Sequence, residues 1–410
     1  MAAKSLHIHI FAAAALGPGV SGGDKIFIEC ARRWAEKGHA ITVYATEEGL
    51  QMSQRYGLNN VRFSIVPVPI RSRIGFSLHY LLKIFRALLL ASRLRLDGSY
   101  QHAIYSASDS LPDVLPSCLL RTRYPAVRWV AAFYFFAPTP WGSKRDEAYR
   151  GGRLPASFRS AVYFLFQQLA YPLIRRYADF ILVCNHLDAE RMQQDGVTES
   201  KIAVLYGGVD LQAIHQIAEP QNKSFEGCFV GRFHVQKGVL VLIDIWARVV
   251  RRFPHARLAV IGEGPLFQEM RQTIHALKLE RNISILGYLD GDEKYRVLKA
   301  SRVFLHTPTH DTGGMAAAEA MACGLPVVGF DLPGYQYCYP KGMSKVPIGD
   351  LDAFAGQVLE LLSNQLPRRQ LQREALEFVQ SWDWSLRASV IEDVFHRLLD
   401  PSTDAQKTFP

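Results

Sequence analysis

The sequence predicts two doubly wound α/β domains, each with a parallel sheet covered by helices on both faces. Apolar runs of strand length alternate with amphipathic segments of helical spacing along most of the 410 residues. Strict alternation of strand and helix is typical of parallel sheets, because their crossover connections place helices on both faces. The length fits two or three domains, and a hydrophobic content of 49% is sufficient for their cores.

The first domain is predicted from its N-terminal strands and helices. The run "LHIHIFAAAA" has the character of a buried strand, and "KIFIECARRWAEKGH" has helical spacing with Gly38 as its stop signal. A second strand, "AITVYATEE", ends at Glu47, and the alternation continues to "KIAVLYGGVD". The segment "IAEPQNKSFEG" then has the composition of a linker. We therefore expect an N-terminal domain over residues 1–213.

The second domain repeats this alternation. Its expected strands are "GCFVGRF", "ARLAVIGEG", "NISILGYL", "RVFLHTP" and "LPVVGFD". They predict a domain over residues 214–380, followed by a helix and tail over residues 381–410 that packs back towards the N-terminal domain. The expected architecture has a cleft between the domains, because open parallel sheets bind ligands at the carboxyl ends of their strands.

Cysteine spacing and hydropathy indicate the compartment. The six cysteines are far apart and form no C-x-x-C, which argues against a disulfide framework or a zinc site. We recognise no secretory signal at the N-terminus, and His79, Lys83 and Arg86 interrupt the most apolar window. We therefore expect a cytoplasmic protein without a membrane-spanning helix.

The glycine-rich stretch "GPGVSGGDK" allows two interpretations. Gly17, Gly19 and Gly22 fit the G-x-G-x-x-G pattern of dinucleotide-binding enzymes, and Glu47 then stands where a ribose hydroxyl would be bound. This interpretation predicts an NAD-dependent oxidoreductase. The other interpretation is an ordinary strand-to-helix turn of a doubly wound domain.

Positive charge is concentrated in the first half of the chain. Residues 1–200 carry 24 basic and 15 acidic residues, whereas residues 201–410 carry 23 of each. Between Arg55 and Arg176 there are 18 basic and 5 acidic residues, together with many aromatic ones. This composition favours an anionic partner, which can be a membrane surface, nucleic acid or a phosphorylated acceptor.

A helix within this basic region is the expected membrane contact. In "FSLHYLLKIFRALLLASRLRL" the polar residues recur at i, i+4, i+7 and i+14, which places them in one basic stripe; they are His79, Lys83, Arg86 and Arg93. At about 1 kcal/mol for each basic residue near an anionic leaflet, we expect reversible peripheral binding. The alternative is an ordinary domain helix, buried on one side and solvated on the other.

Two stretches of the second domain carry the expected chemistry. In "VGRFHVQKG", Arg232 follows a strand end and Lys237 lies at the start of the next helix, where two cations can clamp a phosphate. The alternative is that both are solvated surface charges. In "HTPTHDTGGMAAAEAMACGLPVV", Asp311 ends the loop after a strand and Glu319 lies in an Ala-rich helix. Carboxylates in such packed surroundings need partners, and sugar hydroxyls are suitable ones.

These motifs resemble the nucleotide-sugar site of the family-4 retaining glycosyltransferases. The resemblance rests on Asp311-x7-Glu319, "AMACGLPVV" and "VGRFHVQKG". It extends over nearly the whole chain through "SGGDKIFIECARRWAEKGHAITVYAT", "LYGGVD", "VIGEGP", "LGYLDGDE" and "WDWSLRASVIEDVFHRLL". It implies the GT-B fold, which has two facing Rossmann-like domains and an interdomain cleft. The glycine loop then belongs to a sugar-donor site, and the NAD-dependent oxidoreductase becomes the weaker alternative.

The resemblance also implies roles for individual residues. Arg232 and Lys237 would hold the donor diphosphate. Glu319 would bind the ribose, and Asp311 the hydroxyls of the donor sugar. The expected catalytic residues are Arg232, Lys237 and Asp311. The expected donor-binding positions are Gly22, Gly23, Gly231, Arg232, Lys237, Gly313, Gly314, Met315 and Glu319. The expected acceptor or membrane residues are Lys83, Arg86 and Arg93.

The sequence departs from the family pattern at three places. Asp311 is one methylene shorter than the family's first glutamate, and Gly207 replaces the asparagine of "NGVD". Many members carry a cleft histidine after the strand that here reads "VRWVAAFYFFAPTPW", which contains none. Which of Tyr134, Phe135 or Asp109 lies nearest the acceptor stays open. A degenerate, non-catalytic subunit is therefore an alternative to an enzyme.

A D-x-D pattern at Asp290 and Asp292 matches a metal site of another glycosyltransferase fold. The better interpretation is a turn in which Asp292 caps the following helix. A metal is redundant if Arg232 and Lys237 supply the positive charge. We therefore expect no metal and no cofactor.

The sequence as a whole predicts a cytoplasmic glycosyltransferase. It would move a sugar from a nucleoside-diphosphate sugar to a hydroxyl acceptor with retention of the anomeric configuration. The expected acceptor is a glycan or a lipid-linked molecule, reached by peripheral contact with the cytosolic membrane face. Nucleic acid is not an expected partner, because the sugar-donor site makes it an unsuitable substrate.

Overall fold

The structure is a computed structural model that describes residues 5–15, 20–69, 75–96, 98, 100–140, 158–311 and 313–400. Two compact units divide the chain. Of the described residues, unit 1 contains those up to 140, 158–207 and 384–400, and unit 2 contains those from 208 to 383. The structure divides the units between residues 207 and 208, whereas the sequence predicts the domain boundary six residues later, after residue 213.

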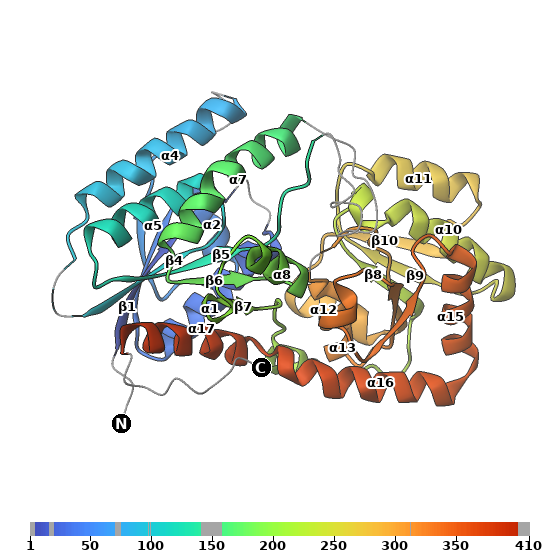
Figure 1. Ribbon diagram of the computed structural model, residues 1–410. Helices are drawn as coiled ribbons and strands as arrows, with labels where there is room; N and C mark the ends of the chain where they lie inside the picture. Colours follow the sequence, from blue (N-terminus) through green and yellow to red (C-terminus); the bar gives the residue numbers. More distant parts are fainter. Residues whose placement is uncertain are drawn as a thin grey trace. The chain divides into compact units, whose positions relative to one another are not determined.

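Unit 1 contains, within its described residues, a seven-stranded parallel sheet in the order β3-β2-β1-β4-β5-β6-β7 (Figure 1). The strands are β1 (Leu6–Phe11), β2 (Ala40–Ala45), β3 (Arg62–Ile65), β4 (Gln101–Ser106), β5 (Arg128–Phe133), β6 (Phe180–Val183) and β7 (Ile202–Val204). The strand order reverses between β1 and β4, and this is the switch point at which doubly wound sheets open a crevice for ligands.

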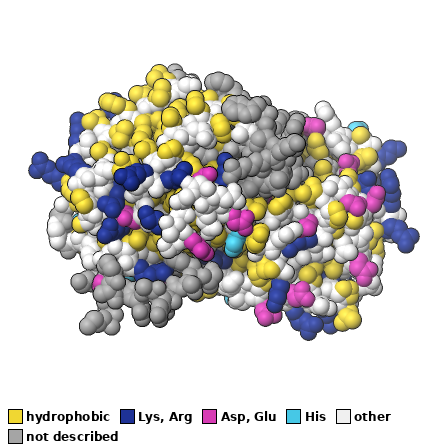
Figure 2. Space-filling model, viewed as in Figure 1, with side chains coloured by type: hydrophobic (Ala, Val, Ile, Leu, Met, Phe, Trp, Pro, Cys, Tyr) yellow, Lys and Arg dark blue, Asp and Glu magenta, His cyan; other side chains and the backbone are white. Residues whose placement is uncertain are grey.

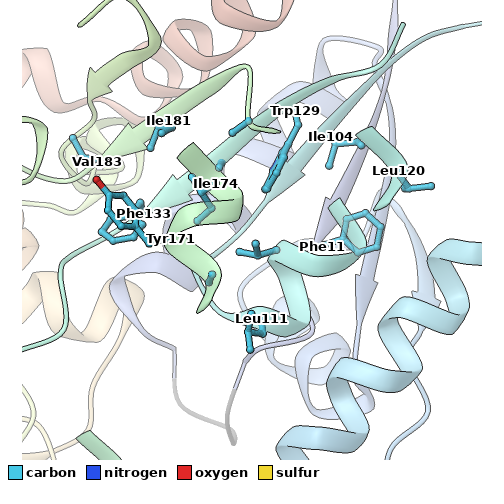
Figure 3. Close-up of a cluster of buried hydrophobic side chains, with 14 of the residues drawn as sticks. Phe11, Ile104, Leu111, Leu120, Trp129, Phe133, Tyr171, Ile174, Ile181 and Val183 are labelled. Carbon is cyan, nitrogen blue, oxygen red and sulfur yellow. The ribbon is translucent and has the colours of Figure 1, made fainter. Parts of the chain in front are cut away.

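Helices cover both faces of this sheet. They are α1 (Gly22–Glu36), α2 (Glu47–Arg55), α4 (Phe76–Arg93), α5 (Leu111–Arg123), α7 (Phe158–Tyr177), α8 (His186–Gln194), the 3₁₀ helix η1 (Glu199–Lys201) and α17 (Trp384–Leu399). Helix α5 packs against both α4 and α7. Beneath them lies a core that includes Phe11, Trp129 and Phe133 (Figure 3). Helix α17 packs on α1, where Trp34 Nε1 donates to the Ala388 carbonyl at 2.9 Å.

The boundary between β2 and α2 differs from the sequence prediction. Strand β2 ends at Ala45, and Thr46 caps α2 by accepting a hydrogen bond from Gly49 N. Glu47 is therefore the first residue of a helix rather than the last of a strand. An acid in the first turn of a helix interacts favourably with the helix dipole. This local effect explains why an acid stands at position 47.

Unit 2 contains, in the described range 208–311 and 313–383, a six-stranded parallel sheet in the order β10-β9-β8-β11-β12-β13. The strands are β8 (Phe225–Val230), β9 (Leu258–Ile261), β10 (Ile283–Gly287), β11 (Ser301–His306), β12 (Val327–Phe330) and β13 (Met343–Val346). Its switch point lies between β8 and β11, which are neighbours in the sheet although β9 and β10 separate them in the chain.

The helices of unit 2 connect these strands. They are α9 (Leu211–Gln216), η2 (Val235–Lys237), α10 (Val239–Arg252), α11 (Phe267–Ala276), α12 (Gly291–Lys299), α13 (Met315–Ala322), α14 (Tyr335–Cys338), α15 (Leu351–Ser363), α16 (Gln365–Val379) and η3 (Gln380–Trp382). The core between sheet and helices includes Phe229, Trp246 and Phe330. Its apolar burial holds the carboxyl ends of β8 and β11 in a fixed position.

The six cysteines are free thiols, five of them buried. Within the described residues, no helix is both long enough and apolar enough to cross a bilayer.

Candidate functional site

The candidate site lies in unit 2, where the chain leaves the carboxyl ends of β8 and β11. Gly231 and Arg232 directly follow β8, and Lys237 ends the short helix η2. Asp311 lies in the loop after β11, just before α13. The switch point between these two neighbouring strands therefore brings both predicted motifs to one edge of the sheet.

Lys237 and Asp311 form a direct ion pair. The Lys237 ammonium lies 2.5 Å from Asp311 Oδ2, and both side chains are largely shielded from solvent. Gly238 makes this approach possible, because it has a φ of 63° and a Cβ there would lie 2.1 Å from the Thr307 carbonyl oxygen. Thr307 Oγ1 also donates to the Lys237 carbonyl at 3.0 Å. The backbone around Lys237 is thus fixed on the loop that carries Asp311.

Arg232 is the exposed cation of the site. In the part of the chain that the structure describes, its guanidinium makes no hydrogen bond or ion pair. The neighbouring His234 reports the local positive potential: burial lowers its pKa, and the charges of Arg232 and Lys237 lower it further. An anion bound at this loop would therefore contact the Lys237 ammonium, whose charge Asp311 partly neutralises, and the Arg232 guanidinium, which has no ionic partner among the described residues.

Glycines shape the loop before α13. Gly314 has a φ of 58°, and a Cβ there would lie 3.1 Å from both His306 Nε2 and Tyr335 Oη. Tyr339 donates to the Gly313 carbonyl at 3.1 Å and to the Gly314 carbonyl at 2.7 Å. No side chain caps the N-terminus of α13, which starts at Met315 within the described range 313–322. Amide groups at such a terminus attract anions.

His306, at the end of β11, is a site residue that the sequence interpretation missed. It is buried, and burial lowers its pKa to about 4, so that it is neutral near pH 7. Its Nε2 lies 2.7 Å from Tyr335 Oη, and among the described residues its Nδ1 has no hydrogen-bond partner. Buried polar atoms usually have a partner, which a ligand or a water molecule can supply. The sequence signal for this residue was a histidine at the end of an apolar strand, where parallel sheets bind ligands.

Glu319 has an unexpected partner within the protein. Its carboxylate lies 2.9 Å from the Lys294 ammonium, and both side chains are buried. Lys294 also lies 3.2 Å from Asp290 Oδ1. A lysine between two carboxylates satisfies the requirement that buried charges be paired. The spacing of Asp290 and Lys294 at i and i+4 was a sequence signal for this contact.

The "DGD" segment does not have the expected cap. Asp290, rather than Asp292, occupies the N-cap position of α12, and it makes no side-chain capping hydrogen bond. Asp292 lies in the first turn, 3.4 Å from Arg296. Both carboxylates of the pattern therefore contact basic residues of the same helix.

In unit 1, the predicted glycine pair lies in a helix rather than in a loop. Gly22 and Gly23 are the first residues of α1, and they lie between the two members of a capping box, the N-cap Ser21 and Asp24. A Cβ on Gly23 would lie 2.3 Å from the Tyr134 ring, whose hydroxyl donates to the Gly23 carbonyl. Close packing with Tyr134 thus explains Gly23. Gly17 and Gly19, the first glycines of the pattern, lie outside the described residues.

Asp109 differs from Tyr134 and Phe135 in being a buried acid. It accepts hydrogen bonds from Gln167 at 2.6 Å and from Tyr163 at 2.8 Å. Burial raises its pKa, and these two hydrogen bonds oppose the shift. The Phe135 carbonyl accepts from the same Gln167 amide. These residues therefore form one hydrogen-bonded group after β4 and β5.

The predicted basic stripe on α4 is wrong. Lys83 is fully buried and its ammonium donates to the Ala15 carbonyl at 2.5 Å, and His79 is also buried. Only Arg86 and Arg93 are exposed. The helix turns the polar stripe partly inward, where the Ala15 carbonyl supplies a partner for the buried ammonium. Its exposed face carries large apolar residues instead.

Family models match both halves of the chain. The model for "Glycosyltransferase Family 4" matches residues 20–213, and the model for "Glycosyl transferases group 1" matches residues 211–378. The phosphatidyl-myo-inositol mannosyltransferase of Mycobacterium tuberculosis is 26% identical over 259 residues, which cover 60% of this chain and 67% of the relative. An uncharacterised glycosyltransferase of Methanocaldococcus jannaschii, MJ1059, is 26% identical over 43% of this chain and 45% of its own length.

Solved structures share the fold. Sucrose-phosphate synthase from Thermosynechococcus elongatus aligns with a TM-score of 0.73 at 17% identity, over 97% of this chain and 100% of that one. Anabaena HepE in complex with UDP-glucose aligns with a TM-score of 0.70 at 15% identity, over 95% and 99% of the two chains. At such identities the likeness establishes the fold, which is that of the GT-B glycosyltransferases.

Proposed function

Since this chain belongs to the family-4 glycosyltransferases, we propose that it moves a sugar from a nucleoside-diphosphate sugar to a hydroxyl acceptor with retention of the anomeric configuration. The observation that carries this proposal is the arrangement of Arg232, Lys237 and Asp311 beside the uncapped start of α13. Two cations and free helix amides suit a diphosphate, and an acid among them suits sugar hydroxyls.

The proposed reaction needs charge stabilisation above all. The bond between the anomeric carbon and the diphosphate oxygen breaks, and negative charge develops on the leaving diphosphate. Arg232, Lys237 and the first amides of α13 would stabilise this charge electrostatically. The acceptor oxygen would form its bond to the anomeric carbon on the face that the diphosphate leaves. Its proton would pass to the departing diphosphate, so that no separate base is required.

Asp311 would have a double role in this reaction. Before the donor binds, its carboxylate holds the Lys237 ammonium at 2.5 Å. When the donor is bound, the Lys237 ammonium would also donate to the diphosphate, and Asp311 would accept hydrogen bonds from the sugar hydroxyls. Glu319 would bind the ribose with the acceptor capacity that its pair with Lys294 leaves, since a carboxylate has about four lone-pair sites.

A metal is not required in this proposal. The donor diphosphate would meet Arg232 and Lys237, and Asp290 of the "DGD" segment already contacts the Lys294 ammonium. Gly231, Gly313, Gly314 and Met315 would line the donor with backbone groups.

The acceptor is proposed to be lipid-linked and to be reached at a membrane surface. The support is an apolar surface of unit 1, here named the α4–α7 face, whose members are each at least half exposed: Leu78, Leu81, Phe85, Leu165 and Leu169. Figure 2 shows hydrophobic side chains gathered over these helices. The stacked rings of Tyr80 and Phe166, 4.7 Å apart, join α4 to α7 beneath this surface.

Exposed arginines on the same helices fit an anionic leaflet. Arg86 and Arg93 lie on α4, and Arg175 and Arg176 lie in the last turn of α7. Each Leu or Phe that leaves water contributes about 1.5–3 kcal/mol, and each nearby arginine adds about 1 kcal/mol. One relative is named for a phosphatidyl-myo-inositol substrate, which also supports a lipid acceptor.

A thermal-shift screen with UDP-, GDP- and ADP-sugars tests the donor assignment. A ligand that binds only the native state raises the melting temperature, so one nucleotide series should stabilise the protein. The Arg232→Ala variant should lose this shift, whereas the exposed Arg251→Ala variant should keep it. If no nucleotide sugar stabilises the wild-type protein, the proposal is wrong. Stabilisation without turnover on any lipid or glycan acceptor would favour the non-catalytic subunit instead.

A further inference from the structure

Three histidines lie together at the amino-terminal edge of the sheet in unit 1. His7 and His9 are two residues apart on β1, so their side chains are on the same face. His102 lies on the neighbouring strand β4, and the strand register places it directly beside His7. His9 and His102 are buried, whereas His7 is partly exposed to solvent. This trio is separate from every residue that the proposed sugar transfer uses.

The distances within the trio suit a shared ion. One ring nitrogen of each histidine lies within 4.8 Å of those of the other two. His9 Nε2 and His102 Nδ1 are 3.0 Å apart. Two nitrogens bound to one tetrahedral zinc at 2.0–2.1 Å would be roughly 3.3 Å apart. A small ring rotation is therefore sufficient to place an ion between them.

Hydroxyl groups of β2 hold two of the rings from outside. His9 Nδ1 lies 2.9 Å from Tyr44 Oη, and His7 Nε2 lies 2.9 Å from Thr42 Oγ1. When His9 donates its Nδ1 proton to Tyr44, the lone pair is on Nε2, the nitrogen that faces His102. Metal-binding histidines usually donate their other ring N–H to such an outer partner, which fixes the tautomer. The histidine rings thus contact one another on the inside and hydroxyl groups of β2 on the outside.

A second group of possible ligands is a weaker candidate. His39, Glu392 and His396 also lie within 4.8 Å of one another, and these two groups are the only such clusters among the described residues. The Glu392 carboxylate is already 2.5 Å from the Lys37 ammonium and 3.0 Å from His39. An ion would have to displace a lysine there, whereas the histidine trio contains no lysine and no carboxylate.

We propose that His7, His9 and His102 bind one divalent transition metal ion, with Zn²⁺ as the best-suited candidate. Imidazole nitrogens suit zinc, copper and nickel rather than magnesium or calcium. Water would occupy the fourth position, reached from the solvent-exposed side of His7. The ion would join the amino-terminal ends of β1 and β4, whereas α1 and its glycine pair follow the carboxyl-terminal end of β1. It would therefore stabilise unit 1 and leave the chemistry of sugar transfer unchanged.

Calorimetric titration of the full-length, tag-free, metal-stripped protein with ZnCl₂ tests this site. We expect one equivalent of zinc to bind with a dissociation constant on the order of 1 μM or lower and to raise the melting temperature. Co²⁺ should bind in its place and produce the visible absorption of a tetrahedral site. The His102→Gln variant should weaken zinc binding at least ~100-fold, and Tyr44→Phe, which removes only the outer hydroxyl, should weaken it ~10–100-fold.

Two matched controls separate this site from other histidines. His215→Gln, at an exposed position of unit 2, and His396→Gln, in the second cluster, should both bind zinc as the wild type does. The Tyr44→Phe variant keeps all three ligands, so it reports on the site even if His102→Gln does not fold. Absence of saturable zinc binding, binding unchanged by both test variants, or binding lost in His396→Gln would overturn the proposal.

Discussion

The Lys237 ammonium lies 2.5 Å from the Asp311 carboxylate, although 74 residues separate the two in the chain. Their strands, β8 and β11, are neighbours in the sheet, so the contact is a consequence of the strand order. The pair joins a residue assigned to the phosphate clamp with one assigned to the sugar. In the absence of donor, each therefore neutralises the other in a partly buried position.

The first prediction concerns the two cations of the site. Replacing Arg232 or Lys237 by Ala should lower turnover by ~10²–10³, the usual effect of removing one preorganised group that stabilises developing charge. Lys237→Ala should also cost stability, because it leaves Asp311 without its ion pair. Steady-state kinetics and thermal melts of both variants measure the two effects, with Arg251→Ala as the control. Turnover near the wild-type value in either variant contradicts the assignment.

The second prediction is that sugar transfer survives EDTA and that the product keeps the donor's anomeric configuration. The physical reason is that two protein cations, rather than a metal ion, stabilise the leaving diphosphate. NMR of the product determines the anomer, and assays with and without EDTA measure the turnover. Loss of turnover in EDTA with rescue by Mn²⁺, or an inverted anomer, would reject this prediction. A fall in melting temperature without loss of turnover would reflect the histidine site alone.

The third prediction separates the two carboxylates. Glu319→Gln should weaken binding of the free nucleoside diphosphate by about 1–2 kcal/mol, since a neutral amide makes weaker hydrogen bonds to ribose than a carboxylate does. Asp311→Asn should reduce turnover more than this affinity, because the free diphosphate lacks the sugar. Calorimetry measures both affinities. Asp290→Asn is the control for stability, since it removes the other carboxylate of Lys294. Equal losses in both variants would contradict the division of roles.

The fourth prediction places membrane binding on the α4–α7 face. Phe85→Ser and Leu169→Ser should each reduce co-sedimentation with anionic vesicles about tenfold, because each removes apolar area that would leave water. Arg86→Gln with Arg93→Gln should reduce binding to anionic vesicles only, and high salt should do the same. The control is Leu366→Ser, an exposed position of unit 2. A wild-type protein that binds no vesicles at low salt would refute the membrane proposal and leave the transferase assignment intact.

The fifth prediction concerns the attachment of α17 in unit 1. Burial acts to raise the pKa of Glu392, but hydrogen bonds from His39 and Lys37 outweigh it and lower the pKa to about 2. A carboxyl with a depressed pKa stabilises the folded state above its unfolded pKa, and this stability is lost as the pH falls towards 2. Glu392→Gln should therefore lower the free energy of unfolding at pH 7, by on the order of 2 kcal/mol.

Urea unfolding at several pH values measures this difference. The gap between wild type and Glu392→Gln should be constant from pH 7 to about 5 and should shrink between about 4.5 and 2. Glu190→Gln, at an exposed acid of α8 in the same unit, is the control. A gap that is independent of pH would show that the ion pair does not contribute.

Local pattern was sufficient for the fold class and for placing three residues of the candidate site at strand ends. Apolar periodicity distinguishes strand from helix, and strict alternation then leads to parallel sheets, so both sheets were predictable. Arg232, Lys237 and Asp311 were predictable because ligand sites lie at the carboxyl ends of such strands. The element ends were less accurate: Glu47 is the first residue of α2 rather than the last of a strand, because the Thr46 side-chain cap decides where the helix begins.

Contacts between distant residues needed the tertiary structure. Charge and periodicity placed Lys83 on a solvated stripe, but the folded chain brings the Ala15 carbonyl to its ammonium, which makes burial possible. Glu319 on α13 has the Lys294 ammonium of α12 beside it because the fold brings the two side chains together, and no local pattern contains that distance. His7 and His102 meet because β1 and β4 are neighbours across the switch point. A sequence specifies which residues can form strands, helices and charged sites, but the order of strands in the sheet decides which of them meet.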